Sequence, residues 1–169
     1  MQRKGIDFHN KFTPVVIWST VRLINMMDDM AGWESIKIDY VLAFYQAPID
    51  SDVYLHLPAG FLVDGEDRNE TYFLKLMKNI YGTCQEAENW FDMLKSGTED
   101  EGFKQKKVGP GIFVRNNCNI IFYVNDYYIS SKDKDTIDAL FKIYQRYPSR
   151  PIMEMLSLIL VSMSEKIQI

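Results

Sequence analysis

The stretch 120–131, which reads I-I-F-Y-V-N-D-Y-Y-I-S-S, constrains the fold more than any other part of the sequence. Residues that favour β-strands run up to Asn125-Asp126, and more of them follow. Because Asn and Asp both tolerate the left-handed backbone of a tight turn, the pattern predicts a β-hairpin with these two residues at its tip. A carboxylate at a hairpin tip is accurately placed to bind a metal ion, although Asp126 could also be no more than a turn residue.

A second acid lies on an earlier predicted strand. In the segment 33–44, W-E-S-I-K-I-D-Y-V-L-A-F, the residues Ile36 and Ile38 alternate with Lys37 and Asp39. This period of two is typical of a strand with one buried and one exposed face. The segment therefore predicts a strand with an acid near its end.

The remaining patterns predict a mixed order of helices and strands. Apolar residues at three- and four-residue spacing predict helices at about 15–30, 85–101 and 134–144, the last with Ile137, Leu140, Phe141 and Tyr144 facing inward. Further strands are predicted at 53–57, 71–76 and 112–114, the last after a loop containing Gly102 and 109–111. This order predicts an α+β domain with a central antiparallel sheet, in which Asp39 lies beside the hairpin that carries Asp126.

Length and composition exclude several classes of protein. The 169 residues fit one domain, and 47% hydrophobic residues with a net charge of −4 describe a globular chain without an overall attraction to nucleic acid. Two cysteines are too few for a disulfide framework or a zinc site. The start lacks the apolar core of a signal peptide, and the apolar stretch 152–163 is too short to span a bilayer. We expect an intracellular protein, cytoplasmic or nuclear, without a membrane partner.

Two acids on neighbouring strands are the minimum needed to hold the metal pair of a nucleotidyl transferase. In that chemistry one metal lowers the pKa of the attacking hydroxyl, and the other neutralises charge on the leaving pyrophosphate. Oxygen ligands suit Mg²⁺, which takes few protein ligands and keeps substrate phosphates in its shell. Spacing alone is weak support, because the chain has 23 acidic residues and so offers many such pairs.

Five blocks of sequence carry a family resemblance. They are K-G-I-D-F-H-N-K-F-T-P-V-V, I-K-I-D-Y-V-L-A-F, V-Y-L-H-L-P-A-G-F, F-L-K-L-M-K-N-I-Y-G-T-C-Q-E-A-E-N-W-F and Y-V-N-D. In content and order they resemble the reverse transcriptase domain of Ty1/copia-type retrotransposon polyproteins, over roughly residues 1–142. The resemblance implies a fingers–palm fragment with a ferredoxin-like palm over 1–144. It also implies RNA-directed DNA polymerase activity with two Mg²⁺ ions, and RNA or DNA template-primer and dNTPs as partners.

The resemblance also assigns roles to the acidic site. Asp39 corresponds to the first metal ligand of the block D-V-K-T-A-F, with the backbone carbonyl of Tyr40 available to the second metal. Asp126 corresponds to the second acid of the family's Y-V-D-D hairpin. Tyr123 corresponds to a residue beside the primer end, although it could simply face the sheet.

Two further residues correspond to nucleotide-binding positions. Phe44 corresponds to the aromatic residue under the sugar, where it would exclude a ribose 2′-OH, or it is a plain core residue on the strand. Gln85 corresponds to a residue that touches the incoming nucleotide, or it is a solvent-facing residue near a helix start.

The sequence departs from the family at functionally important positions. Asn125 replaces the first acid of Y-V-D-D, the family's principal hairpin ligand, and so removes a full negative charge facing two divalent cations. Glu86 and Glu88 stand where the family has neutral and basic residues, and acids facing a phosphate backbone repel it. Leu42 occupies a usually polar position. We therefore expect severe loss of polymerase activity, and whether the chain is an active enzyme stays open. The alternative is a non-catalytic remnant that binds nucleic acid or protein.

The tail, residues 145–169, does not continue the family pattern. It shows no clear helix or strand period, and permitted codons for 142–166 read in a shifted frame can yield a family-like G-D-V-K-S-Y-L-G. Our hypothesis is that a frameshift near Lys142 wrote this tail. The rival interpretation is a short hydrophobic C-terminal helix, which Pro148 and Pro151 disfavour.

Overall fold

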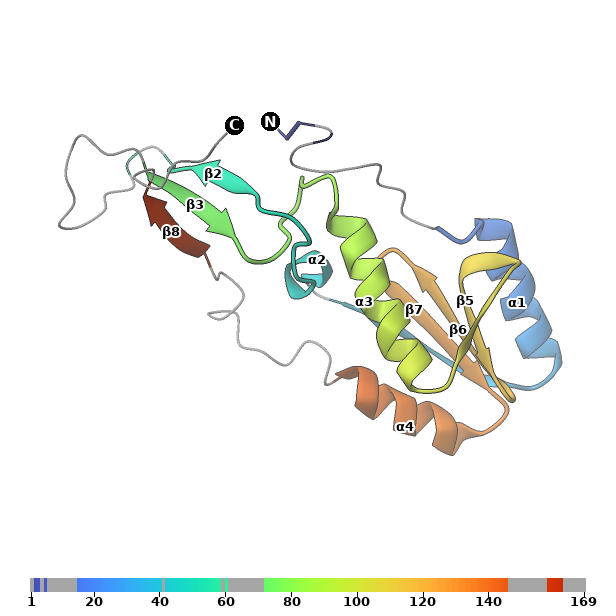
Figure 1. Cartoon of the computed structure of the whole chain (residues 1–169). Helices are drawn as coiled ribbons and strands as arrows, with labels where there is room; N and C mark the ends of the chain where they lie inside the picture. The colour runs from blue at the N-terminus through green and yellow to red at the C-terminus, as the bar shows by residue number, and fades with distance from the viewer. Residues whose placement is uncertain are drawn as a thin grey trace.

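The computed structural model describes residues 2, 3, 5, 15–40, 42–58, 60, 72–145 and 158–162. Within these residues lie four helices and eight strands (Figure 1): α1 Trp18–Met30, β1 Glu34–Asp39, α2 Ala43–Gln46, β2 Tyr54–His56, β3 Tyr72–Leu76, α3 Glu86–Asp100, β4 Lys104–Lys106, β5 Gly109–Arg115, β6 Cys118–Tyr123, β7 Asp126–Ser131, α4 Lys134–Gln145 and β8 Leu158–Ser162. None of the helices among these residues is long and apolar enough to cross a membrane.

A five-stranded sheet with the order β1-β7-β6-β5-β4 organises most of the chain, and each neighbouring pair is antiparallel. The predicted α+β class and central antiparallel sheet are thus confirmed. The prediction that the strand of Asp39 lies beside the hairpin is also confirmed, because β1 pairs with β7 along its whole length. β1 and β7 join the first and last thirds of the described chain.

The main core fills one face of this sheet. Alternate residues of β6 and β7 point toward α3 and α4, as the period of two requires. The buried members include Ile120 and Phe122 of β6, Tyr127 and Ile129 of β7, Trp90, Phe91 and Leu94 of α3, and Leu140 and Tyr144 of α4. Burial of this aromatic and aliphatic set is the main contribution to stability of the sheet and its two helices.

The opposite face of the sheet is covered in part by α1, which lies on the other side of the strands from α3 (Figure 1). A small cluster of Val16, Val21, Ile112 and Ile121 fills the contact. Farther along α1, the buried carboxylate of Asp28 accepts hydrogen bonds from the hydroxyl of Ser130 at 2.5 Å and the amide of Asn119 at 3.2 Å. α1 is therefore held to the sheet by a small apolar cluster and by the hydrogen bonds of Asp28 with Ser130 and Asn119, which we call the Asp28 clamp.

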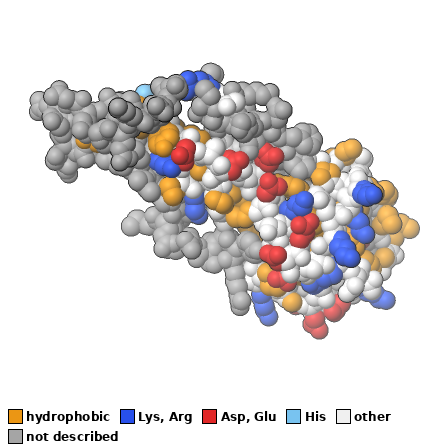
Figure 2. Space-filling view, in the orientation of Figure 1, with side chains coloured by type: hydrophobic (Ala, Val, Ile, Leu, Met, Phe, Trp, Pro, Cys, Tyr) orange, Lys and Arg blue, Asp and Glu red, His pale blue; other side chains and the backbone are white. Residues whose placement is uncertain are grey.

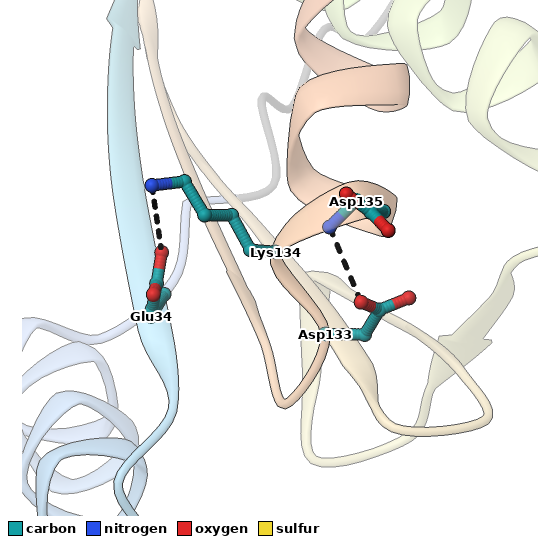
Figure 3. Close-up of polar contacts among 4 residues, drawn as sticks. All are labelled: Glu34, Asp133, Lys134 and Asp135. Atoms are coloured by element: carbon teal, nitrogen blue, oxygen red, sulfur yellow. Dashed lines mark hydrogen bonds and ion pairs between the residues drawn. The ribbon is translucent and has the colours of Figure 1, made fainter.

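Asp133 comes directly before the first residue of α4 and caps this helix (Figure 3). Its Oδ1 accepts the backbone N–H of Asp135 at 3.2 Å, and its Oδ2 accepts the hydroxyl of Thr136 at 2.9 Å. The first of these bonds satisfies a backbone N–H that the first turn of a helix leaves without an intrahelical partner. Lys134 then reaches Glu34 of β1, with 4.0 Å between Nζ and Oε2. This ion pair between two exposed side chains links the start of α4 to the edge strand that ends in Asp39.

A second, three-stranded sheet has the order β2-β3-β8 and lies away from α1 and α4 (Figure 1). β8 lies in the tail and pairs antiparallel with β3, with Leu74 opposite Leu160. The rival interpretation of the tail as a helix is therefore wrong for 158–162, where an apolar run completes a sheet edge. The rest of the tail, apart from Gln145, lies outside the described residues, as do most of residues 1–14.

Several predicted elements differ from the structure. The strand predicted over 33–44 ends at Asp39, and α2 follows after Leu42, whose φ of 56° breaks the extended backbone. β5 begins at Gly109 instead of 112, because β4 offers it a partner strand that the sequence pattern did not predict. Phe141, predicted to face inward from α4, is exposed, because Ile137, Leu140 and Tyr144 already fill that helix face.

Candidate active site

The candidate site is a row of three side chains across neighbouring strands. Asp39 of β1 lies directly opposite Asp126 of β7, which in turn lies opposite Tyr123 of β6. Directly opposed residues of an antiparallel pair point to the same face, with Cβ atoms about 5 Å apart. This is the face that α1 partly covers, and the ring of Tyr123 packs against Trp18 of α1 with centroids 5.0 Å apart.

Two carboxylates opposed on one ladder are locally unfavourable, because like charges directly opposite each other destabilise a sheet. Asp39 is exposed, and within the described part of the chain no hydrogen bond or ion pair holds its carboxylate. Local conflicts of this kind concentrate at functional sites. The pairing of Asp39 with Asp126 thus supports a site that binds positive charge.

The hairpin turn lies one residue earlier than predicted. Val124 and Asn125 form the turn, and Asp126 is already the first residue of β7. The left-handed residue is Val124, with φ 58°, an uncommon conformation for a β-branched side chain. Pairing of Asp126 with both Tyr123 and Asp39 makes it a strand residue and not a turn residue, and its role as a metal ligand stays a prediction.

Contacts from two sides hold the turn in place. The indole N–H of Trp90 in α3 donates to the carbonyl of Val124 at 3.2 Å, and the backbone N–H of Tyr40 donates to the carbonyl of Asn125 at 3.2 Å. Sequence reasoning missed Trp90, although a buried tryptophan on a helix needs an acceptor for its N–H. Tyr40 thus connects the end of β1 directly to the turn.

Oxygen atoms of three neighbouring residues could bind the divalent cations that the resemblance implies. The side-chain oxygen of Asn125 is buried and has no hydrogen-bond partner. Within the described residues no group of three or more His, Cys, Asp or Glu side chains could hold a metal ion. Mg²⁺ is commonly bound by one or two carboxylates together with substrate phosphates. Asp39, Asp126 and the Asn125 oxygen are compatible with such a site, with one charge fewer than three acids would supply.

Lys37 is a site residue that the sequence analysis did not identify. Its Nζ lies 3.0 Å from Oδ2 of Asp126. The strand period could have found it, because Lys37 is two residues before Asp39 and so points to the same face. Its ammonium group partly neutralises the paired acids. It also forms an ion pair with Oδ2 of Asp126, an oxygen that a metal ion would need as a ligand.

Phe44 lies on α2 and not on a strand, so that part of its plain-core alternative is wrong. The side chain is buried, and its ring meets the exposed ring of Tyr81 edge-on at a centroid distance of 5.1 Å. Tyr45 meets the same Tyr81 ring at 5.4 Å. A sugar approaching this part of the surface would therefore meet Tyr81 before Phe44.

Gln85 is fully buried at the N-terminal end of α3, so the alternative of a solvent-facing residue is wrong. Its Nε2 donates to the hydroxyl of Ser51 at 3.0 Å, and its Oε1 accepts from Nε2 of Gln2 at 2.9 Å. Gln2 also accepts the backbone N–H of Cys84 at 2.7 Å. The structure therefore holds the side chain of Gln85 in contacts with other protein groups.

The acids of α3 create a negative surface beside this helix start. Figure 2 shows several acidic side chains along α3 on the face in view. Glu86 accepts the N–H of Gly82 at 2.8 Å, and partial burial raises the pKa of its carboxyl despite that bond. Glu86 therefore ties the start of α3 to the preceding turn, and it also adds negative charge to this surface.

Comparison with known proteins gives the family. The family model for "Reverse transcriptase (RNA-dependent DNA polymerase)" matches residues 1–148. The Pol polyprotein of transposon RE2 from Arabidopsis thaliana is 30% identical over 147 residues, covering 82% of this chain and 10% of the relative. That of transposon TNT 1-94 from Nicotiana tabacum is 28% identical over 144 residues, covering 82% of this chain and 11% of the relative.

The chain spans about a tenth of the length of these relatives. The Pol polyprotein of transposon RE1 from Arabidopsis thaliana adds a match at 28% identity, covering 86% of this chain and 10% of the relative. No solved structure matches the chain significantly. The five sequence blocks, the paired acids on a hairpin-centred sheet and the family match agree, and the chain belongs to the reverse transcriptase (RNA-dependent DNA polymerase) family as a copia-type member.

Proposed function

We propose that the chain is the fingers–palm portion, over 1–144, of a copia-type reverse transcriptase. In this proposal the five-stranded sheet with α3 and α4 is a ferredoxin-like palm that binds a template-primer and a dNTP. The observation that carries it is the direct pairing of Asp39 with Asp126 on the face left partly open by α1. Residues 145–169 are a tail of frameshifted origin.

The proposed chemistry is nucleotidyl transfer with two Mg²⁺ ions, which supply activation of the primer hydroxyl and neutralisation of the leaving pyrophosphate. Asp39 and Asp126 would hold the ions, with the carbonyl of Tyr40 as a further oxygen. The bond from Tyr40 N–H to Asn125 fixes the spacing of β1 and the turn, and the bond from Trp90 fixes the turn against α3. Gln85 would contact the nucleotide only after its hydrogen bonds with Gln2 and Ser51 break. Phe44 would contact it only after the ring of Tyr81 moves aside.

Polymerase activity in this proposal is severely reduced by Asn125. The amide keeps the shape of an aspartate and one oxygen, but it carries no charge. Removing one preorganised charge-stabilising group commonly costs about 100-fold to 1000-fold in rate. The buried, unpartnered oxygen of Asn125 supports this position as a vacated ligand site.

Primer extension tests the proposal. Three chains would be compared on a primed RNA template with dNTPs and Mg²⁺: the unaltered chain, Asn125→Asp, and Asn125→Asp combined with Asp39→Asn. We expect Asn125→Asp to extend the primer at least about 100-fold faster than the unaltered chain, and Asn125→Asp combined with Asp39→Asn to lose the gain. Equal extension with Asn or Asp at 125 would contradict the assigned role of this position.

A second candidate function is non-catalytic binding of nucleic acid. The ion pair of Lys37 with Asp126 favours it, because this face is partly charge-compensated without a metal. Salt-sensitive RNA binding by a chain in which Asn125→Asp restores no synthesis would favour this function. The frameshift hypothesis is tested separately by reading the locus in all three frames beyond codon 142, where a continuing polymerase frame is expected.

A further inference from the structure

The outward face of α1 is more apolar than the face that packs on the sheet. Toward the sheet α1 presents Val21 and the buried carboxylate of Asp28. Four large apolar side chains have more than half of their surface exposed: Leu23 (56%), Met26 (62%), Met27 (59%) and Met30 (87%). Figure 2 shows hydrophobic side chains at the end of the molecule where Figure 1 draws α1, and no element of the described chain is drawn beyond this helix. Contiguous exposed apolar surface of this kind marks an interaction site.

The spacing of the outward residues is that of a seam between two helices. Ser19, Leu23, Met26 and Met30 follow one another at intervals of four, three and four residues. These are the intervals of the two inward positions of a seven-residue coiled-coil repeat, so the four side chains form one stripe along α1. Met27 borders the stripe on one side. The stripe therefore has the geometry to pack against a second helix.

Opposite charges border the stripe on its other side. Arg22 and Asp29 come directly before Leu23 and Met30, so they share one flank of the helix, where coiled coils place the charges that set orientation. Both side chains are exposed, and within the described residues neither takes part in an ion pair. The guanidinium of Arg22 lies 5.9 Å from the centre of the Trp18 ring on the same flank. One cation and one anion thus stand toward opposite ends of a single flank.

We propose that α1 is a self-association surface, on which two copies of this chain pair their α1 helices antiparallel about a two-fold axis. The axis reverses one helix, so that Leu23 of one copy packs beside Met26 of the other. Arg22 of each copy then meets Asp29 of the other, which gives two equal ion pairs. A parallel pair would instead place Arg22 beside Met27 and leave both charges unmatched. The charges therefore favour the antiparallel pair, which is independent of the proposed polymerase activity.

The short length of α1 sets the strength that we expect. Its 13 residues form a helix about 20 Å long. One pair of helices this short buries less surface than the roughly 1,200–2,000 Å² of a stable interface. We therefore expect a weak, reversible dimer and no larger species, because a two-fold contact closes on itself.

Sedimentation velocity over a concentration series in the micromolar range tests the pairing. The unaltered chain should shift from monomer to dimer as its concentration rises. Leu23→Gln combined with Met26→Gln should weaken the dimer at least about 30-fold, because both copies lose apolar contact along the stripe. Val108→Gln changes an apolar residue of the turn between β4 and β5 that is also exposed, and it should leave the dimer unchanged. Circular dichroism would verify that each variant folds.

Charge reversal tests the antiparallel orientation. Arg22→Glu alone, or Asp29→Arg alone, should weaken the dimer about tenfold, because each turns both ion pairs into repulsions. A mixture of these two variants should recover the dimer, since the two reversed groups then meet each other and the two unaltered groups meet each other. Lys142→Glu reverses an exposed charge on α4, which packs on the other face of the sheet, and it should have no effect.

Three outcomes would overturn the proposal. A monomer throughout the concentration series would do so, and it would favour a different protein partner for α1. Dimers that persist with Leu23→Gln and Met26→Gln combined would place the contact elsewhere on the chain. A mixture of the charge-reversed variants that associates no more strongly than each variant alone would refute the antiparallel pair. None of these outcomes changes the result expected in primer extension, so the proposed function would stand.

Discussion

Val124 holds the active-site hairpin in a conformation that its own side chain disfavours. A left-handed backbone costs a non-glycine residue about 1–2 kcal/mol, and φ at Val124 is 58°. Replacement by glycine removes this strain but adds backbone entropy to the unfolded chain, about 0.5–1 kcal/mol. We expect Val124→Gly to raise the free energy of unfolding by about 0.5 kcal/mol in urea denaturation.

Asn116 supplies the matched control for this prediction. It also has positive φ, at 49°, but asparagine tolerates that conformation. Asn116→Gly should therefore leave stability unchanged or slightly lowered. A Val124→Gly variant that unfolds more readily than the parent would mean that the valine side chain contributes packing that outweighs its strain.

Lys37 should compete with divalent cations for Asp126. Its ammonium lies 3.0 Å from Oδ2, so a dication must displace it or bind beside it. At this exposed position the charge is largely screened, and we expect Lys37→Gln to strengthen Mg²⁺ binding only about threefold to tenfold. Titration calorimetry with Mg²⁺ would measure it, and Lys104→Gln should have no effect. Unchanged affinity would show that Lys37 does not restrict the site.

At the scale of elements, Asp28 attaches α1 to the sheet. The carboxylate accepts from Ser130 and Asn119, and few apolar residues share the contact. Asp28→Ala would leave these buried donors unsatisfied, at a cost of about 1–3 kcal/mol in the free energy of unfolding. The neighbouring Asp29 is exposed, so Asp29→Ala should stay within about 0.5 kcal/mol of the parent in the same urea denaturation. Equal effects would argue against the clamp.

The clamp should also depend on pH. Burial raises the pKa of the Asp28 carboxyl, against the opposing effect of its hydrogen bonds from Ser130 and Asn119. The folded chain therefore holds this proton better than the unfolded chain. The stability that follows is fully present below the ordinary pKa of aspartate, and it is lost as pH rises through the raised value. Urea denaturation across pH 4 to 7 should show this component in the parent and not in Asp28→Asn; identical pH profiles would contradict it.

The elements with a clear period were predictable from sequence, and those that depend on a distant partner were not. The alternation of Ile36 and Ile38 with Lys37 and Asp39 predicted β1 and its exposed acid. The hairpin was predicted one residue out of register, because asparagine and aspartate suit a left-handed turn better than valine does. Asp126 pairs with Asp39 as well as with Tyr123, and the pairing with Asp39, a residue far away in the sequence, could not be read from the local pattern.

The same distinction between local pattern and distant partners applies to the candidate site. The three members of the row came from local pattern and family resemblance, and the structure brings them together. Burial of Gln85 could not be foreseen, since it depends on Gln2 and Ser51, which lie 83 and 34 residues away. The Trp90 contact with the hairpin likewise joins residues 34 positions apart. Long-range polar contacts of this kind have no local sequence signal.

At the scale of the whole molecule, the small sheet takes no part in the two apolar clusters that surround the five-stranded sheet, as far as the residues of β2 and β3 show. Both apolar clusters within the described residues are built from the five-stranded sheet, its helices and the α2 region, and neither contains a residue of β2 or β3. β3 is instead the central strand between β2 and β8. The tail contributes β8, which pairs with β3 along one edge of the small sheet.

Truncation after residue 145 should separate these two contributions. Loss of β8 frees alternate backbone N–H groups of β3, since a central antiparallel strand donates to both neighbours. We expect faster amide hydrogen exchange in 72–76, measured by mass spectrometry, while exchange in 118–131 and the melting temperature of the main core stay the same. Protection lost across both segments would mean that the sheets unfold as one unit. Unchanged exchange in 72–76 would mean that β8 does not pair with β3 in solution. The tail would then add no strand to the small sheet.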